Sequence, residues 1–177
     1  MSRLTTMDPT EASGLLAETF ASIKRAAGMI PNAYLTIGTH SPEGLDAVLR
    51  IDEVVAKSDI SDADLEIIRL VVSEWTGCRY CIAAHSLKAH FFGLSHEITS
   101  NIREGSSTGD FRRDALVEFV RTIFSSKGAL NSQSVESIIA AGYSERQIIE
   151  MSLAIASTIF ISTVNRINDT EIDYPEF

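Results

Sequence analysis

From Gly77 to His85 the chain reads Gly-Cys-Arg-Tyr-Cys-Ile-Ala-Ala-His, and this stretch contains both of its cysteines. Two residues separate Cys78 from Cys81, a spacing that places the sulfurs about one helical turn apart and close enough for a short disulfide. His85 follows Cys81 by four residues, so on a helix its imidazole lies over the Cys81 sulfur. A thiol pair with a histidine on the next turn indicates redox chemistry.

The composition is that of an ordinary globular protein. The chain has 177 residues, 45% of them hydrophobic and 22% charged, which suits one domain with a sizeable core. A formal net charge of −9 disfavours nucleic acid or an anionic membrane as partner, because those surfaces attract basic patches. Residues 1–9 lack the apolar stretch of a secretory signal, and no run is long enough to span a membrane. We therefore expect a cytoplasmic protein, whose disulfide serves a catalytic cycle and not a structural role.

Helix signals dominate the chain, and no segment alternates polar and apolar residues over the length of a strand. Met29-Ile30-Pro31-Asn32 is expected to be a break, because proline disfavours helical backbone in the residue before it. Caps, prolines and glycines elsewhere predict an all-α protein of about eight helices. The predicted helices span residues 8–28, 41–54, 61–75, 78–93, a segment starting at 95, and then 110–125, 134–141 and 144–167.

The last predicted helix is apolar nearly all round between Leu153 and Ile161, which indicates burial in the core alone or in the core and a subunit contact. Its first half also echoes an earlier segment, since residues 61–73 and 144–156 share a serine cap and the same apolar spacing. At this offset the cysteines fall on Ile161 and Val164, so the second copy carries no thiol chemistry. Two helical hairpins related by an approximate twofold explain the echo, and so does chance similarity of amphipathic helices.

The two cysteines have competing interpretations. A helix N-terminus favours a thiolate at Cys78, whereas the imidazole of His85 favours Cys81 as the nucleophile. Two small buried hydrophobes are the unreactive alternative. Zinc could take Cys78, Cys81 and His85 as three ligands, but the remaining histidines do not supply a second ligand pair at zinc-site spacing. Haem attachment needs a histidine where the chain has Ile82, and an iron–sulfur cluster needs more thiolates.

A proton relay also needs a carboxylate, and Glu66 and Glu74 precede the cysteines. A break at Gly77 would turn Glu74 away from the pair. Glu66 lies about 18 Å before Cys78 along a continuous helix, so it approaches His85 only if the chain folds back at Gly77. From spacing alone, a solvated position for Glu66 competes with the chemical one.

Taken together, these residues resemble a known family. Glu66, Cys78-x-x-Cys81 and His85 are similar to the signature of the AhpD-like alkylhydroperoxidases in the carboxymuconolactone decarboxylase superfamily. The decarboxylases proper lack the cysteine pair, so the resemblance is to the thiol branch. It extends over most of the chain and implies a single domain over residues 1–177, with residues 1–58 as a helical extension packed on it. The supporting segments are Ile68-Arg69-Leu70-Val71-Val72-Ser73, Gly28-Met29-Ile30-Pro31-Asn32, His40-Ser41-Pro42 and Gly142-Tyr143-Ser144.

The resemblance implies a thiol-dependent peroxidase. Cys81 would be the peroxide-reactive thiolate and Cys78 its resolving partner, with Glu66 and His85 as a proton relay through a water. Tyr80 stands where the best-known member has a histidine, and its hydroxyl could support the relay by a hydrogen bond. The family also implies an all-α trimer or hexamer without metal, haem or flavin, and a dithiol reductant that in some members is a lipoylated protein.

Two alternatives stay open at this stage. The pair could serve a disulfide oxidoreductase or redox sensor with little peroxidase activity, or the chain could be a non-catalytic oligomeric module. A substrate pocket lined by apolar helix faces is expected near Trp75 and Phe91, which favours an organic peroxide.

Overall fold

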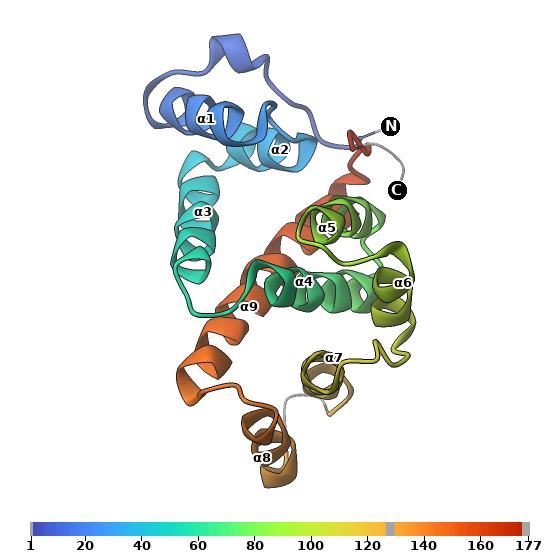
Figure 1. Cartoon of the computed structure of the whole chain (residues 1–177). Helices are drawn as coiled ribbons and strands as arrows, with labels where there is room; N and C mark the ends of the chain where they lie inside the picture. The colour runs from blue at the N-terminus through green and yellow to red at the C-terminus, as the bar shows by residue number, and fades with distance from the viewer. Residues whose placement is uncertain (1, 127–129, 175–177) are drawn as a thin grey trace.

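The computed structural model describes residues 2–126 and 130–174. Within these ranges the chain forms α-helices and one short 3₁₀ helix, and it contains no β-strand, which confirms the predicted all-α class. Figure 1 shows α9 running diagonally through the molecule. The first described residues meet its carboxy-terminal end, where the backbone N–H of Arg3 donates to the Asn168 carbonyl at 2.7 Å. The elements are η1 (Pro9–Glu11), α1 (Gly14–Ala27), α2 (Asn32–His40), α3 (Pro42–Ala56), α4 (Asp62–Thr76), α5 (Arg79–Phe91), α6 (His96–Glu104), α7 (Phe111–Ser125), α8 (Ser132–Ala140) and α9 (Glu145–Asn168).

Two differences from the predicted elements lie in the amino-terminal part. The first predicted helix is divided into η1 and α1, with Ser13 in extended backbone as the N-cap of α1. A helix absent from the prediction, α2, begins directly after Pro31. It has no side-chain cap of its own, and the backbone N–H of Asn32 donates instead to the Asp173 carboxylate at 2.7 Å. This cap comes from the far end of the chain, so local sequence signals do not predict the helix.

The main core surrounds α4, which packs against α9, α5, α7 and α6. Between Asp64 and Ser73 every side chain except the partly buried Arg69 is buried, as expected for the middle of a central helix. Ile67, Ile68, Leu70 and Val72 are all 0% exposed. A second, smaller cluster is formed by α1, α2 and α3 and is packed against Ile161 and Val164 of α9.

Gly77 ends α4 in the left-handed conformation, with φ of 65°, which glycine adopts without steric cost. The chain reverses there and α5 packs back along α4, forming the predicted hairpin. In α9 the position that corresponds to Gly77 in the sequence echo is Phe160, and the helix continues through it. The two similar segments therefore begin alike and end differently.

α9 is 24 residues long, and its length and hydropathy would allow it to cross a membrane, so the expectation that no run reaches this length is wrong. Its surroundings are those of a core helix, because it contacts α2, α3, α4 and α5. It also buries polar side chains, which include Ser157, Thr158, Ser162 and Asn165. These polar groups face the site described next.

Candidate redox site

Cys78 and Cys81 form a disulfide at the start of α5, with their Cα atoms 5.3 Å apart. Cys78 is the N-cap of the helix, and its sulfur accepts a hydrogen bond from the backbone N–H of Cys81 at 3.2 Å. The two residues are only 1% and 2% exposed. The sulfurs therefore meet as their spacing predicted, in a nearly buried position.

Glu66 of α4 lies beside His85 of α5 because the chain folds back at Gly77. One carboxylate oxygen, Oε2, is 2.7 Å from His85 Nδ1. Glu66 is 1% exposed, so the solvated alternative for this residue is wrong. Glu74 points elsewhere and pairs with Arg103 of α6, as the predicted break at Gly77 implied.

Arg69 holds the other side of the same carboxylate, with its Nη1 2.6 Å from Glu66 Oε1. Its Nη2 also lies 3.5 Å from Asp52 of α3, whose carboxylate accepts a hydrogen bond from Ser157 of α9. The guanidinium is mostly buried, and it ties α3, α4 and α9 around Glu66. The sequence prediction did not assign Arg69 to the site, although its place one helical turn after Glu66 was a usable signal.

These contacts set the protonation states of the pair. Burial alone would raise the pKa of Glu66, but the charge and hydrogen bond of His85 and the charge of Arg69 outweigh it and lower the pKa to about 2. Burial lowers the pKa of His85, against the opposing effect of Glu66. Because a carboxylate can only accept, Nδ1 of the neutral imidazole carries its proton and the lone pair is on Nε2. His85 is thus arranged as a base.

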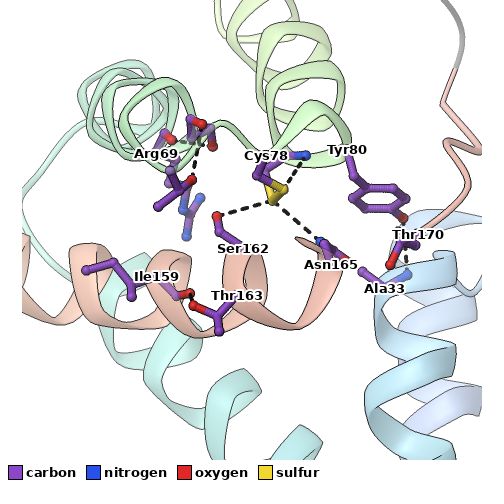
Figure 2. Close-up of a disulfide and its surroundings, with 12 residues drawn as sticks. Ala33, Arg69, Cys78, Tyr80, Ile159, Ser162, Thr163, Asn165 and Thr170 are labelled. Carbon is purple, nitrogen blue, oxygen red and sulfur yellow. Dashed lines mark hydrogen bonds between the residues drawn. A yellow bond between two sulfur atoms is a disulfide. The ribbon is translucent and has the colours of Figure 1, made fainter. Parts of the chain in front are cut away.

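Two side chains of α9 donate hydrogen bonds to the Cys81 sulfur, as Figure 2 shows. Ser162 Oγ is 3.3 Å from the sulfur and Asn165 Nδ2 is 3.5 Å from it. The sequence analysis did not assign either residue to the site, because the second copy of the sequence echo has no cysteines and this part of α9 was expected to carry no thiol chemistry. Their signal was a pair of polar residues, one turn apart, on a helix whose surroundings are apolar. Among the described residues, His85 makes no hydrogen bond to this sulfur.

Tyr80, between the two cysteines, is engaged in structural contacts. Its hydroxyl donates to Asp173 at 2.8 Å and accepts from the backbone N–H of Ala33 at 3.3 Å. Its ring meets Tyr174 edge-to-face at 5.4 Å. Burial raises the pKa of Tyr80, so the hydroxyl keeps its proton. The residue therefore joins α5 to α2 and to the carboxy-terminal segment, and among the described residues its hydroxyl makes no hydrogen bond to Glu66 or His85.

The disulfide adjoins two openings of different size. The first, which we call the Cys81 cavity, has a volume of about 50 Å³, and it is lined among others by Tyr34, Arg69, Cys81, His85, Lys88 and Tyr174. The second, the Cys78 groove, has a volume of about 170 Å³ and lies between the start of α5 and the end of α9. Its lining includes Cys78, Arg79, Tyr80, Asn165, Arg166 and Asp169.

The expected pocket near Trp75 and Phe91 is not one site. Trp75 stacks on Phe124 and lines a cavity of about 440 Å³ with Glu74 and Arg103, among residues that do not include the cysteines. Phe91 lines a different cavity, of about 370 Å³, which also contains Glu66, Arg69 and Lys88. This part of the prediction is therefore wrong for Trp75. Within the described residues no group of three or more His, Cys, Asp or Glu side chains is arranged to hold a metal ion.

Comparison with solved protein structures identifies the fold that carries this site. The alkylhydroperoxidase AhpD core of a peroxidase-related protein from Ralstonia eutropha superposes with a TM-score of 0.87 over 97% of this chain and 92% of its own, at 15% identity. The fold is AhpD-like. A peroxidase-related protein from a Silicibacter species is similar at a TM-score of 0.78 and 19% identity, over 96% of this chain and 92% of its own.

A further AhpD-like neighbour shows that proteins of this shape differ in chemistry. The debrominase Bmp8, in a cysteine-to-alanine variant bound to 2,3,4-tribromopyrrole, superposes with a TM-score of 0.81 at 22% identity. The match covers 98% of this chain and 94% of that protein. No family profile and no curated protein sequence matches the chain. The resemblance in the sequence is thus confirmed at the level of the fold.

Proposed function

We propose that this protein is a thiol peroxidase that reduces a peroxide with the Cys78–Cys81 pair. One observation carries the proposal: Cys81 and His85 line the same small cavity, and His85 is held there by the ionised, buried Glu66. A reactive thiol needs a nearby base, and a base needs a partner that fixes its tautomer. Glu66 fulfils the second requirement, with Arg69 fixing Glu66 in turn.

In the oxidising half of the cycle, His85 Nε2 takes the thiol proton of Cys81 through solvent in the cavity. The Cys81 thiolate then attacks the distal peroxide oxygen, so that a sulfur–oxygen bond forms and the oxygen–oxygen bond breaks. The alkoxide or hydroxide that leaves takes the proton from His85. Ser162 and Asn165 stabilise the thiolate by donating to its sulfur.

In the second step the Cys78 sulfur attacks the Cys81 sulfenic acid. The disulfide forms and water leaves. The backbone N–H of Cys81 and the N-terminus of α5 favour the Cys78 thiolate required for this step. An external dithiol, in some AhpD-like proteins a lipoylated protein, is proposed to restore the pair. The homo-oligomer and the cytoplasmic location implied by the sequence remain predictions.

The size of the Cys81 cavity limits the peroxide. About 50 Å³ holds only a few water molecules, so hydrogen peroxide or the hydroperoxyl end of a larger molecule fits beside the sulfur.

The test is peroxide turnover with two single-cysteine variants. Cys81→Ser should lose turnover, whereas Cys78→Ser should make one round of reaction and stop at a sulfenic acid that dimedone traps. Full activity in Cys81→Ser would refute the assignment of the nucleophile.

A disulfide oxidoreductase is the second candidate. It is supported by the Cys78 groove, whose volume is larger than that of the Cys81 cavity and leaves more space for a thiol substrate. Wild-type protein that exchanges disulfides with a dithiol but consumes no peroxide would favour this candidate. A chain whose free thiols do not decrease by two after peroxide would instead favour the non-catalytic module.

A further inference from the structure

The two sulfurs of the disulfide adjoin different openings, and Tyr80 lines both of them. Its hydroxyl is fixed by Asp173 and Ala33, so the ring is held between the Cys81 cavity and the Cys78 groove. The Cys81 cavity has a volume of about 50 Å³, and the Cys78 groove has a volume of about 170 Å³. A peroxide fits the first space, but a thiol with its carbon chain needs the second.

We propose that the Cys78 groove is the binding site of the reductant, and that it selects a thiol that bears a negative charge. The inference rests on the proposed thiol chemistry. It further specifies which sulfur the reductant attacks and the chemical class of the reductant. The peroxide reaches Cys81 through the cavity, and the thiol reaches Cys78 through the groove between α5 and α9. Oxidant and reductant therefore do not compete for the same space.

The charges around the groove support an anionic ligand. Arg79 and Arg166 are exposed at its rim, on a chain whose formal net charge is −9. Its described lining contains one carboxylate, Asp169, and Arg3 pairs with that carboxylate at 3.7 Å. A local positive field on an acidic protein attracts anions to this face.

A buried polar atom lies at the same place. The Asn165 amide nitrogen donates to the Cys81 sulfur, while its Oδ1 is buried without a hydrogen-bond partner among the described residues. An unpartnered buried acceptor is costly unless a ligand satisfies it. Asn165 lines the groove, so this unpartnered acceptor belongs to the wall against which the proposed ligand would lie.

The hydrogen bonds to the two sulfurs are also consistent with attack at Cys78, because they favour Cys81 as the sulfur that is expelled. A thiolate attacks a disulfide in line with the bond and expels the sulfur on the far side. The Cys81 sulfur already accepts from Ser162 and Asn165, which stabilise it as a leaving thiolate. The Cys78 sulfur accepts from one backbone N–H.

The reduction then balances in two steps. The reductant thiolate forms a bond to the Cys78 sulfur, and the electron pair of the Cys78–Cys81 bond goes to Cys81. A second thiolate attacks the reductant sulfur of this mixed disulfide and releases the Cys78 thiolate, which takes a proton. The protein gains two electrons, and two thiols become one disulfide.

The first experiment compares two reagents on the single-cysteine variants, both as folded proteins. In Cys81→Ser, 5,5′-dithiobis(2-nitrobenzoate), an anionic disulfide, should label Cys78 at least tenfold faster than it labels Cys81 in Cys78→Ser. Hydrogen peroxide should show the opposite preference. Repeating both reactions in denaturant controls for intrinsic reactivity and should remove the difference. If both reagents prefer the same cysteine in the folded protein, the two-opening arrangement is wrong.

The second experiment measures charge selection with wild-type protein oxidised by diamide, so that it does not depend on peroxidase activity. Three thiols with the same two-carbon chain serve as probes: 2-mercaptoethanesulfonate, 2-mercaptoethanol and cysteamine. Each of Arg79→Gln and Arg166→Gln should slow reduction by the anionic thiol about threefold and leave the neutral thiol unchanged. The ratio of variant to wild type cancels the pKa differences between the thiols themselves.

Arg50→Gln is the matched control, since this exposed arginine of α3 pairs with Asp46 and lines neither opening. It should leave all three rates unchanged. Equal effects of Arg79→Gln and Arg166→Gln on all three thiols would refute anionic selection. Charge selection without peroxide turnover would refute the peroxidase and leave the reductant site standing.

Discussion

α4 and α9 start from similar sequences and have opposite roles in the site. Each begins at a serine N-cap, Ser61 or Ser144, and the two helices pack against each other in the core. α4 ends at Gly77, and the reversal there starts α5 at the disulfide and places His85 next to Glu66. α9 continues through the corresponding Phe160 and contributes Ser162 and Asn165 as donors to the Cys81 sulfur.

The comparison shows that the turn at Gly77 gives two similar helices different roles in the site. The interrupted helix and its hairpin partner carry the thiols, the base and the carboxylate. The continuous helix carries neutral polar groups that stabilise charge on the sulfur. Four predictions test this division, beginning with the largest expected effect.

The carboxylate of the interrupted helix should dominate the acid sensitivity of the fold. Its folded pKa of about 2 lies below the ordinary 4.5, so as the pH falls between these values the unfolded chain takes up a proton and the folded one does not. The free energy of unfolding should therefore fall by on the order of 3 kcal/mol between pH 4.5 and pH 2. The lowered pKa of His85 acts in the same direction below pH 6.5.

Denaturant titrations across this pH range measure the effect. Glu66→Gln should flatten the profile, whereas Glu145→Gln, at the exposed start of α9, should keep the wild-type slope. An unchanged slope in Glu66→Gln would show that Glu66 is not held ionised by its neighbours.

The same carboxylate should control the rate of peroxide reduction. Glu66→Gln leaves His85 without an anionic partner, so the second-order rate constant should fall about 100-fold in stopped-flow assays. The wild-type rate should decline only below pH 6.5, because burial lowers the pKa of His85. Glu74→Gln is the control on the same helix, since Glu74 pairs with Arg103 away from the disulfide. A similar loss in both variants would contradict the relay.

The donors of α9 should have a smaller effect on the same thiol. Ser162→Ala or Asn165→Ala removes a hydrogen bond to the charged form of Cys81, which should raise the pKa of the thiol and slow peroxide reduction threefold to tenfold. Ultraviolet titration of the thiolate in a Cys78→Ser background measures the pKa directly. Ser152→Ala, on the exposed face of α9, should change neither quantity. An unchanged thiol pKa would remove α9 from the chemistry.

The turn itself should give the smallest effect. A Cβ at Gly77 would meet no atom within 4 Å, so Gly77→Ala should cost about 1 kcal/mol of stability from backbone strain alone. At Phe160 of α9 the preference reverses, and Phe160→Gly should be about 1 kcal/mol less stable than Phe160→Ala. Thermal or denaturant unfolding measures both pairs. Equal tolerance of alanine and glycine at the two positions would contradict the assigned backbone conformations.

Much of the fold could be predicted because its signals are local. Serine caps, prolines and glycines marked most helix ends, and the apolar stripes between them predicted the all-α class. α2 escaped prediction since its first N–H is capped by Asp173 from the other end of the chain. α9 read correctly as a buried helix, but its polar residues were not connected to the site.

By itself, the sequence determined the paired thiols, the base one turn away and the break at Gly77, because these depend on spacings of a few residues along one hairpin. Tertiary structure decided the rest. It brought Arg69 and Asp52 around Glu66, placed Ser162 and Asn165 on the Cys81 sulfur, and gave each cysteine its own opening. These contacts join helices far apart in the chain, and the burial that shifts the pKa values of Glu66 and His85 arises only when those helices pack together.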